Sequence, residues 1–225
     1  AGVRDAGHVS GGARTAPHLL GRRASAALAL CAGIDCAGDA AALATAGGRR
    51  PAMAEQLIDE EVDARDIAAV ISGEICAITR RAAELAEDKM AETGKGGVPA
   101  AYAVMVLGSG GRGESLLAAD QDNAIVYEDG AGAGADAWFA ELGGHLADIL
   151  DTAGIPYCKG GVMARNDQWR HDVSGWKAVI DEWIRRSRPE DLLNVDIFYD
   201  LTPVHGALAL AEEIRAHAFA KAAPA

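Results

Sequence analysis

Two acidic side chains follow closely on a glycine-rich segment in the middle of this 225-residue chain. The segment is Gly108-Ser109-Gly110-Gly111-Arg112-Gly113-Glu114, and Asp120-Gln121-Asp122 comes soon after it. In extended backbone, side chains two residues apart project from the same side, so Asp120 and Asp122 can share one or two hard cations. Glycine lets backbone N–H groups approach a phosphate closely, and Ser109 and Arg112 add a hydroxyl group and a cation. The pattern predicts a site for the phosphates of a nucleotide bridged by Mg²⁺.

Each half of this pattern has a simpler interpretation when it is taken alone. A glycine run is often only a tight turn, and an Asp-x-Asp pair is often only solvated. Residues 108–114 fit neither the P-loop pattern, which needs Gly-Lys-Ser/Thr, nor the Rossmann glycine spacing. The six histidines show no HxxxH or HExxH spacing, so no zinc site is predicted. The combination, placed between two apolar segments, favours the nucleotide site.

The segments around the motif alternate between strand and helix patterns. Apolar runs at 102–107 and 123–127 predict two buried strands, with a glycine turn and a short helix between them. Helical spacing predicts a helix over about 136–152, another from near Asp172, and a closing helix over 206–220. The run Leu192, Val195, Ile197, Phe198 and Tyr199 predicts a third strand. Trp169, Trp176 and Trp183, spaced by seven, predict a packing seam in the core.

The first part of the chain has a helical pattern instead. Residues 52–91 predict a helical hairpin joined near 63–66, and the first fifty residues predict one or two short helices. The glycine-rich stretch at 94–97 would stop the second helix. We therefore expect an α-helical N-terminal region over 1–97 and a second domain over 98–225. The fold class is α+β (mixed α/β), with a small mixed sheet under helical cover.

Composition narrows the classes of function. The net charge is −12, with a pI near 4.9, which disfavours a nucleic-acid partner. No apolar stretch approaches the roughly 20 residues of a bilayer span, so no membrane association is expected. Residues 1–12 lack the apolar core of a signal peptide. Four cysteines without a CxxC pair indicate a reducing compartment, and we expect a cytoplasmic protein.

With these residues, the sequence resembles the nucleotidyltransferases of the DNA polymerase β superfamily. The segments 108–114 and Asp120-Gln121-Asp122-Asn123-Ala124 are similar to their signature. The likeness is closest to nucleotidyltransferases often fused to CBS pairs and cyclic-nucleotide-binding domains, which are relatives of PII-protein uridylyltransferases. Further landmarks are 159–164 and 197–200, and the likeness covers roughly two thirds of the chain.

The resemblance implies a role for each matching residue. Gly108 and Ser109 would hold the triphosphate of an NTP substrate, and Asp120 and Asp122 would bind Mg²⁺ or Mn²⁺. A third carboxylate is expected from a later strand, where Asp196 and Asp200 both qualify. We favour Asp200, because residues 198–201 better resemble the corresponding family segment.

Two basic residues and one departure complete the expected site. Arg112 is a candidate to neutralise phosphate charge, although a structural pair with Glu114 or another acid is an equal alternative. Lys159 is expected in a loop over the nucleotide, with a plain solvated loop as the alternative. Thr202 stands where the family usually has arginine, which removes one cation that could meet the nucleotide.

The sequence thus predicts a Mg²⁺-dependent nucleotidyltransferase that transfers a nucleoside monophosphate from NTP to a protein or small-molecule acceptor in signalling. Because the regulatory modules of the family are not in these 225 residues, a CBS or cyclic-nucleotide-binding partner is a further expectation. Two alternatives are a catalytically silent nucleotide-binding sensor and a helical interaction module that binds no nucleotide.

Overall fold

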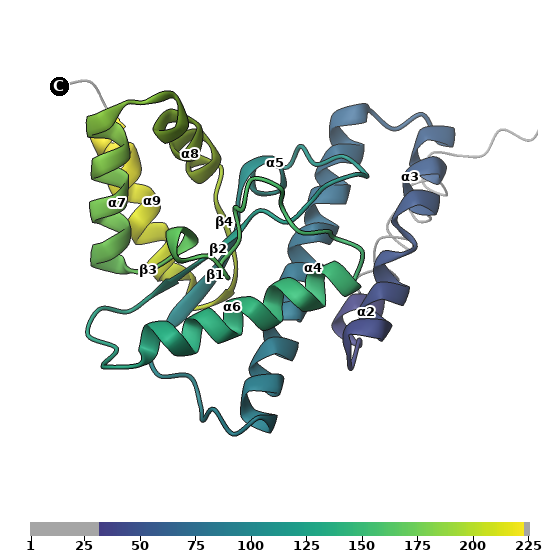
Figure 1. Ribbon diagram of the computed structural model, residues 1–225. Coiled ribbons are helices and arrows are strands. Elements are labelled where there is room, and N and C mark those ends of the chain that lie inside the picture. Colours follow the sequence, from purple (N-terminus) through teal and green to yellow (C-terminus); the bar gives the residue numbers. More distant parts are fainter. Residues whose placement is uncertain (1–31, 223–225) are drawn as a thin grey trace, which may run out of the picture.

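The computed structural model describes residues 32–222, which form a mixed sheet covered by helices (Figure 1). The strands are β1 (Tyr102–Val106), β2 (Asn123–Tyr127), β3 (Arg170–Asp172) and β4 (Thr202–Gly206). The helices, in chain order, are α2 (Ala40–Gly47), α3 (Arg50–Asp59), α4 (Ala64–Glu92), α5 (Gly108–Arg112), α6 (Ala135–Thr152), the 3-10 helix η1 (Asp167–Trp169), α7 (Val173–Arg186), α8 (Pro189–Tyr199) and α9 (Leu208–Ala222). The predicted α+β class is confirmed.

The sheet has the strand order β3-β2-β1-β4. The central strand β1 pairs antiparallel with both β2 and β4, while β3 runs parallel to β2 at the other edge. Both central strands are buried throughout, because each face of the sheet carries its own layer of helices. This explains why their sequences are continuous apolar runs without the alternation of a half-exposed strand.

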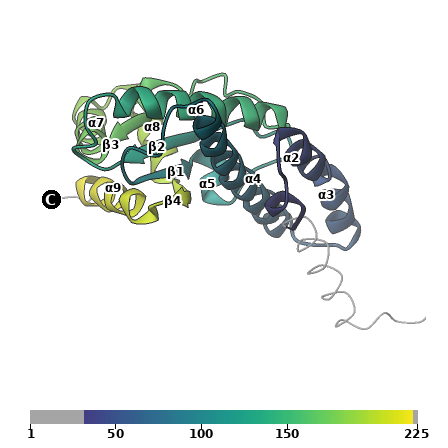
Figure 2. The ribbon, with the colours of Figure 1, turned by 90° about the horizontal axis from the view of Figure 1, so that it is seen from below.

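Alternate side chains of β1 enter two different cores. Tyr102, Val104 and Val106 join the core made with α4 and α6, to which α2 and α3 also contribute. Ala103 and Met105 join the core made with α7, α8 and α9. Figures 1 and 2 both place α2 and α3 at the end of the molecule far from α7 and α9.

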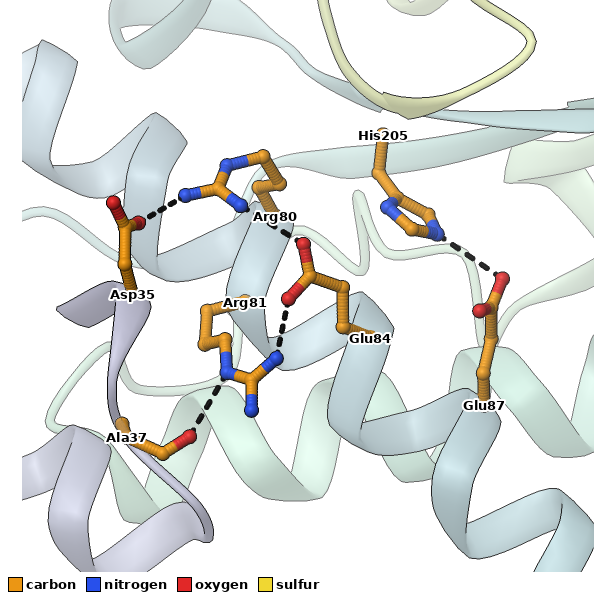
Figure 3. A network of polar contacts seen from close by, with 7 residues as sticks. All are labelled: Asp35, Ala37, Arg80, Arg81, Glu84, Glu87 and His205. Atoms are coloured by element: carbon orange, nitrogen blue, oxygen red, sulfur yellow. Dashed lines mark hydrogen bonds and ion pairs between the residues drawn. The ribbon is translucent and has the colours of Figure 1, made fainter.

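Polar contacts fix the long helix α4 to elements on either side of it (Figure 3). Arg80 pairs with Asp35, and the Nε–H of Arg81 donates to the carbonyl oxygen of Ala37 at 2.9 Å, which ties the segment before α2 to α4. Farther along α4, the carboxylate of Glu87 meets Nε2 of His205 on β4 at 3.0 Å. The helix therefore links the N-terminal segment to the edge of the sheet.

The hairpin predicted over 52–91 is confirmed as α3 and α4. Asp63 caps α4, because its Oδ1 accepts the N–H of Arg65 at 2.9 Å. The strands predicted at 102–107 and 123–127 are confirmed as β1 and β2. The predicted helices over 136–152, from near Asp172 and over 206–220 correspond to α6, α7 and α9.

The third strand predicted over 192–199 is wrong, because this segment is the helix α8. Pro189 occupies the first turn, followed by Glu190 and Asp191, which is the pattern of a helix start. A short apolar run of this kind does not by itself distinguish a buried strand from a buried helix. The strand at the edge of the sheet is β4 instead, and Pro203 lies at an irregularity of its pairing with β1, where a missing N–H is tolerated.

The three tryptophans form the predicted packing seam. Their ring centroids lie 5.7 to 6.3 Å apart, and all three side chains are buried. The ring of Phe198 on α8 packs against Trp176, with 5.0 Å between the ring centroids. The side of α8 that carries Phe198 therefore faces the core. This aromatic cluster supports the helical layer over one face of the sheet.

The structure describes only part of the N-terminal region predicted to be helical. Residues 32–35 are helical and α2 follows, whereas residues 1–31 lie outside the described range. The boundary predicted at residue 97 falls in the loop between α4 and β1, and the division into two domains stays a prediction. No helix within residues 32–222 has the length and apolar character needed to cross a membrane.

Candidate functional site

The candidate site lies where β1 ends and β2 begins. Because the two strands are antiparallel, these ends are adjacent, and the N–H of Leu107 donates to the carbonyl oxygen of Asp122 at 2.9 Å. This bond extends the strand pair by one position beyond Val106 and Asn123. It also places the Asp-x-Asp segment beside the start of α5, which Figure 1 shows at this end of the sheet.

Asp120, Asp122 and Cys158 form a cluster at this position. One ligand atom from each residue lies within 4.8 Å of the other two. Cys158 comes from the loop after α6, and its thiol lies beside the Asp122 carboxylate. No other group of three or more His, Cys, Asp or Glu side chains lies close enough for metal binding within residues 32–222.

The surroundings of the cluster change the acidity of its members. Burial raises the pKa of Asp122 to about 6, the hydrogen bond from Cys158 lowers it, and the nearby charge of Asp120 raises it. Burial also raises the pKa of the Cys158 thiol, and the Asp122 charge acts in the same direction. Negative charge at this position is therefore costly, and a bound cation would relieve that cost.

Two buried polar side chains hold the Asp-x-Asp segment in place. Gln121 donates through Nε2 to the carbonyl oxygens of Ala147 and Ile155, both at 2.9 Å. Asn123 accepts the N–H of Ala164 at 2.9 Å through its Oδ1. Since side chains alternate along the segment, Gln121 and Asn123 anchor it to α6 and to the loop that carries Cys158, while the two aspartates lie together with Cys158.

A small cavity of about 10 Å³ lies beside this segment, between the start of α5 and α4. Its lining includes Ser109, Asp120, Gln121, Asp122 and Asn123. Two buried atoms there, Gln121 Oε1 and Asn123 Nδ2, have no hydrogen-bond partner among the described residues. The space is about that of one water molecule, so a nucleotide does not fit inside it.

The glycines of α5 allow two close approaches. Gly108 has a φ of +56°, and a Cβ there would lie 3.0 Å from Oδ2 of Asp122. A Cβ at Gly111 would lie 1.8 Å from the carbonyl oxygen of Asp200. A side chain at Gly108 would crowd Asp122, and one at Gly111 would push α5 away from the end of α8.

Arg112 and Asp200 form an ion pair on the α8 side of the site. The Nε–H of Arg112 also donates to Glu114 at 2.8 Å, so the guanidinium group binds two carboxylates. Thr202 donates through its hydroxyl group to the carbonyl oxygen of Gly111 at 2.8 Å. These contacts attach the end of α8 and the start of β4 to α5.

The structure separates the predicted site residues into groups. Asp120 and Asp122 lie together beside Gly108 and Ser109, as described above, whereas Asp200 is outside that cluster. The expectation that Asp196 and Asp200 share the face of a strand is wrong: Asp196 is exposed within α8, and Asp200 follows its last residue.

Lys159 lies directly after Cys158 in the loop that follows α6. Its side chain is exposed and has no ion-pair partner among the described residues. The N–H of Gly161 donates to the carbonyl oxygen of Cys158 at 3.1 Å, so Lys159 sits in a turn. Lys159 is thus a cation directly adjacent in sequence to Cys158, one member of the cluster.

Sequence reasoning missed the position of Cys158 in the cluster. Its only sequence signal is that it precedes the landmark at 159–164, since no second cysteine or histidine stands nearby in the chain. Asp122 and Cys158 are 36 positions apart, and helix α6 lies between them. Their proximity is a tertiary contact.

The donor set of the cluster fits a divalent cation. Two carboxylates within ligand distance of one another are the usual anchors of Mg²⁺ or Mn²⁺, and water and substrate oxygens complete such a shell. The unpartnered Gln121 Oε1 in the adjoining cavity offers an acceptor for an ordered water. The residues present can therefore hold the metal ion that the resemblance implies.

No protein of known, curated function matches the chain. A family model does match, and it covers residues 48–190, well over half of the 225 residues. The matched range contains the glycine segment, Asp120, Asp122 and Cys158, and it ends before Asp200. The model bears the description "Putative nucleotidyltransferase DUF294", and the chain belongs to this nucleotidyltransferase family.

Proposed function

We propose that this protein is a divalent-cation-dependent nucleotidyltransferase that moves a nucleoside monophosphate from NTP to a hydroxyl group of a protein or small-molecule acceptor. The observation that carries the proposal is the pair of carboxylates, Asp120 and Asp122, held beside the first residues of α5. Family membership supports the same reaction class.

Asp120 and Asp122 are the proposed metal ligands and catalytic residues. Mg²⁺ or Mn²⁺ bound there would neutralise the triphosphate and lower the pKa of the acceptor hydroxyl. The buried hydrogen bonds of Gln121 and Asn123 keep the two carboxylates at a fixed spacing. Such positioning is the main contribution that a protein makes to phosphoryl and nucleotidyl transfer.

The triphosphate is proposed to lie along α5. Gly108 and Ser109 would contact phosphate oxygens through backbone N–H groups and the serine hydroxyl. Arg112 is about half exposed, so its guanidinium group can reach an incoming phosphate. Lys159, exposed and without an ion pair among the described residues, would add a second cation from the facing loop.

In the proposed reaction, the acceptor oxygen forms a bond to the α-phosphorus, and the bond from that phosphorus to the bridging oxygen of pyrophosphate breaks. The proton of the acceptor hydroxyl passes to a base, and pyrophosphate leaves with the electron pair of the broken bond. Arg112 and Lys159 would stabilise the negative charge that builds on this leaving group.

Asp200 is proposed as the third carboxylate and as the base. In that role its side chain has to exchange Arg112 for the metal ion or the acceptor. The exchange is feasible because the Arg112–Asp200 pair is partly exposed, and such pairs contribute little to stability. A triphosphate would provide Arg112 with an alternative anionic partner.

The charge and surface of the chain favour a protein or small molecule as acceptor. A net charge of −12 repels RNA and DNA. Leu116 and Leu117, which are 72% and 46% exposed, are apolar side chains in the loop that joins α5 to Asp120. An acceptor protein would cover these side chains.

The likeness to PII-protein uridylyltransferases and to proteins fused with CBS or cyclic-nucleotide-binding modules suggests a role in signalling. In this proposal a regulatory partner of one of those classes acts together with the chain. Co-purification of the chain with such a module tests this part separately from the chemistry.

The central experiment measures binding of the four NTPs with Mg²⁺ or Mn²⁺ by thermal shift, since a ligand of the native state raises Tm. Pyrophosphate release in the presence of candidate acceptors then measures turnover. We expect the double variant Asp120→Asn, Asp122→Asn to lose metal-dependent nucleotide binding, while Asp59→Asn on the exposed side of α3 keeps it. Equal nucleotide binding by both variants would contradict the proposal.

One observation favours a second function, a nucleotide sensor without turnover. Asp200 is engaged by Arg112 and lies outside the metal-binding cluster, so among residues 32–222 the cluster has two carboxylates and no third. A sensor of this kind would bind NTP with Mg²⁺ by calorimetry and release no pyrophosphate with any acceptor tested.

A further inference from the structure

Cys158 is the third group of the carboxylate cluster, and its position is well fixed. The backbone N–H of Gln121 donates to the carbonyl oxygen of Pro156 at 2.9 Å, and that of Asn123 donates to Val162 at 3.1 Å. Cys158 lies between these two anchor points on the facing loop. Two side chains also bind this loop: Gln121 contacts Ile155, and Asn123 contacts Ala164. The thiol is therefore held against Asp122 by hydrogen bonds on both sides.

The cluster offers a mixed set of donor atoms. Carboxylate oxygens suit hard ions such as Mg²⁺, whereas a thiolate prefers softer ions such as Zn²⁺, Co²⁺ and Cd²⁺. One ligand atom from each of Asp120, Asp122 and Cys158 lies within 4.8 Å of the others, close enough for a single ion to contact all three. A site with two oxygen ligands, one sulfur ligand and open positions resembles the donor count of catalytic Zn²⁺ sites.

A second observation at the same place points to a ligand. Gln121 is 2% exposed, and its Oε1 accepts no hydrogen bond from any described residue. It lines the cavity of about 10 Å³ that Asp120 and Asp122 also line. A buried acceptor without a donor is costly, and a water molecule coordinated to an ion in the cluster would satisfy it.

We infer that Cys158 is a third protein ligand at the metal site of Asp120 and Asp122, so that this site binds thiophilic ions such as Zn²⁺ or Co²⁺ through sulfur, in addition to Mg²⁺. The inference rests on the proposed function, because it concerns the same metal site. Cys158 would contact the ion while Asp200 is still paired with Arg112, before any exchange of that pair. When the ion binds, the thiol proton leaves to solvent and the sulfur forms the bond to the metal.

The test uses Co²⁺ alone as the probe, added to the 225-residue chain without nucleotide. A cobalt–thiolate bond produces a sulfur-to-metal charge-transfer band in the near ultraviolet. We expect this band in the unchanged protein and in Cys36→Ser, which removes an exposed cysteine far along the chain. We expect its loss in Cys158→Ser and in the Asp120→Asn, Asp122→Asn variant.

Affinity provides the second measure. Loss of a direct ligand should weaken Co²⁺ binding at least about tenfold, since even groups that only support a ligand commonly contribute this much. Mg²⁺ binding, which depends on oxygen ligands, should change by less than about threefold in Cys158→Ser. A Co²⁺ spectrum without the sulfur band, or a band that persists in Cys158→Ser, overturns the inference.

Alkylation of the unchanged protein keeps the test independent of variant folding. Iodoacetamide labelling followed by peptide mass spectrometry should show that Cd²⁺ protects Cys158 and that Mg²⁺ protects it much less. Equal labelling with and without Cd²⁺ also overturns the inference. If the unchanged protein gives these negative results and still binds NTP with Mg²⁺, only the role of Cys158 is refuted. If the unchanged protein binds no nucleotide with any divalent ion, the proposed function itself is refuted.

Discussion

Gly111→Ala tests whether the packing of α5 against the end of α8 shapes the site. A Cβ at Gly111 would lie 1.8 Å from the carbonyl oxygen of Asp200 and 2.8 Å from that of Val106. Real Cβ atoms essentially never approach a neighbour within 3.0 Å, so the Asp200 backbone would have to move by at least 1.2 Å. Both obstructing atoms belong to the backbone, and no side-chain rotation relieves them.

The size of the effect follows from this geometry. Overpacking commonly costs about 1–3 kcal/mol, and a clash between backbone segments belongs at the upper end. Alanine in place of glycine in a helix gains up to about 1 kcal/mol, which offsets part of that cost. The net loss is therefore about 2 kcal/mol. For a chain of this size, that loss corresponds to a Tm decrease of about 4–8 °C.

Differential scanning calorimetry of the metal-free protein measures this change, and Gly144→Ala is the matched control. Gly144 lies within α6 and has nothing within 4 Å of an added Cβ, so alanine there should raise the Tm by about 2–4 °C. If Gly111→Ala raised the Tm as much as Gly144→Ala, α5 would not pack on the Asp200 backbone, and the arrangement of the site described above would be wrong.

Four further perturbations have expected outcomes. The pKa of Asp122 is raised from its ordinary 3.8 to about 6. The stability that protonated Asp122 contributes is therefore fully present below pH 3.8 and is lost as the pH rises through 6. Asp122→Asn should raise the Tm of the metal-free protein at pH 7, and calorimetry at pH 4 should find a smaller difference. Metal affinity should fall by about tenfold per pH unit below 6, as calorimetric titration with Mn²⁺ can measure, because the ion binds the carboxylate. A hydrogen bond from His205 and another from Tyr102 lower the pKa of Glu87, so Glu87→Gln should cost about 1–2 kcal/mol at pH 7 and less as the pH falls below 4.5. The exposed Glu92→Gln should be neutral in the same urea titrations. Asp200→Asn should leave metal binding by Asp120 and Asp122 nearly unchanged and reduce pyrophosphate release, and an unchanged rate would remove Asp200 from the mechanism.

Much of the fold was predictable because the local signals were consistent. The apolar runs of β1 and β2 are bounded by glycine and polar residues, and Asp63 and Asp172 stand at the cap positions of α4 and α7. The segment of α8 was ambiguous, since a short apolar run can be a buried strand or a buried helix. Pro189 and the acidic residues after it were the signals that favour a helix.

The site was predictable only as far as its parts are close in sequence. Asp120 and Asp122 lie beside Gly108 because an antiparallel strand pair brings the two ends together, and the sequence contains both strands. Cys158 reaches the cluster from a distant loop, and Asp200, at the end of α8, contacts α5 beside it. Their positions depend on hydrogen bonds made by Gln121 and on the packing of a helix end against Gly111, which no local pattern encodes.

The two sides of the site are held by interactions of different strength. On the side of Cys158, buried hydrogen bonds from Gln121 and Asn123 fix the loop, and unmaking them would leave polar groups without partners in the interior. On the other side, Arg112 and Asp200 form a partly exposed ion pair. Water or phosphate can replace either partner at little cost. Adjustment to a nucleotide is therefore expected on the α5 and α8 side, because that is where partners can be exchanged without opening the core, while the metal-binding side keeps its geometry.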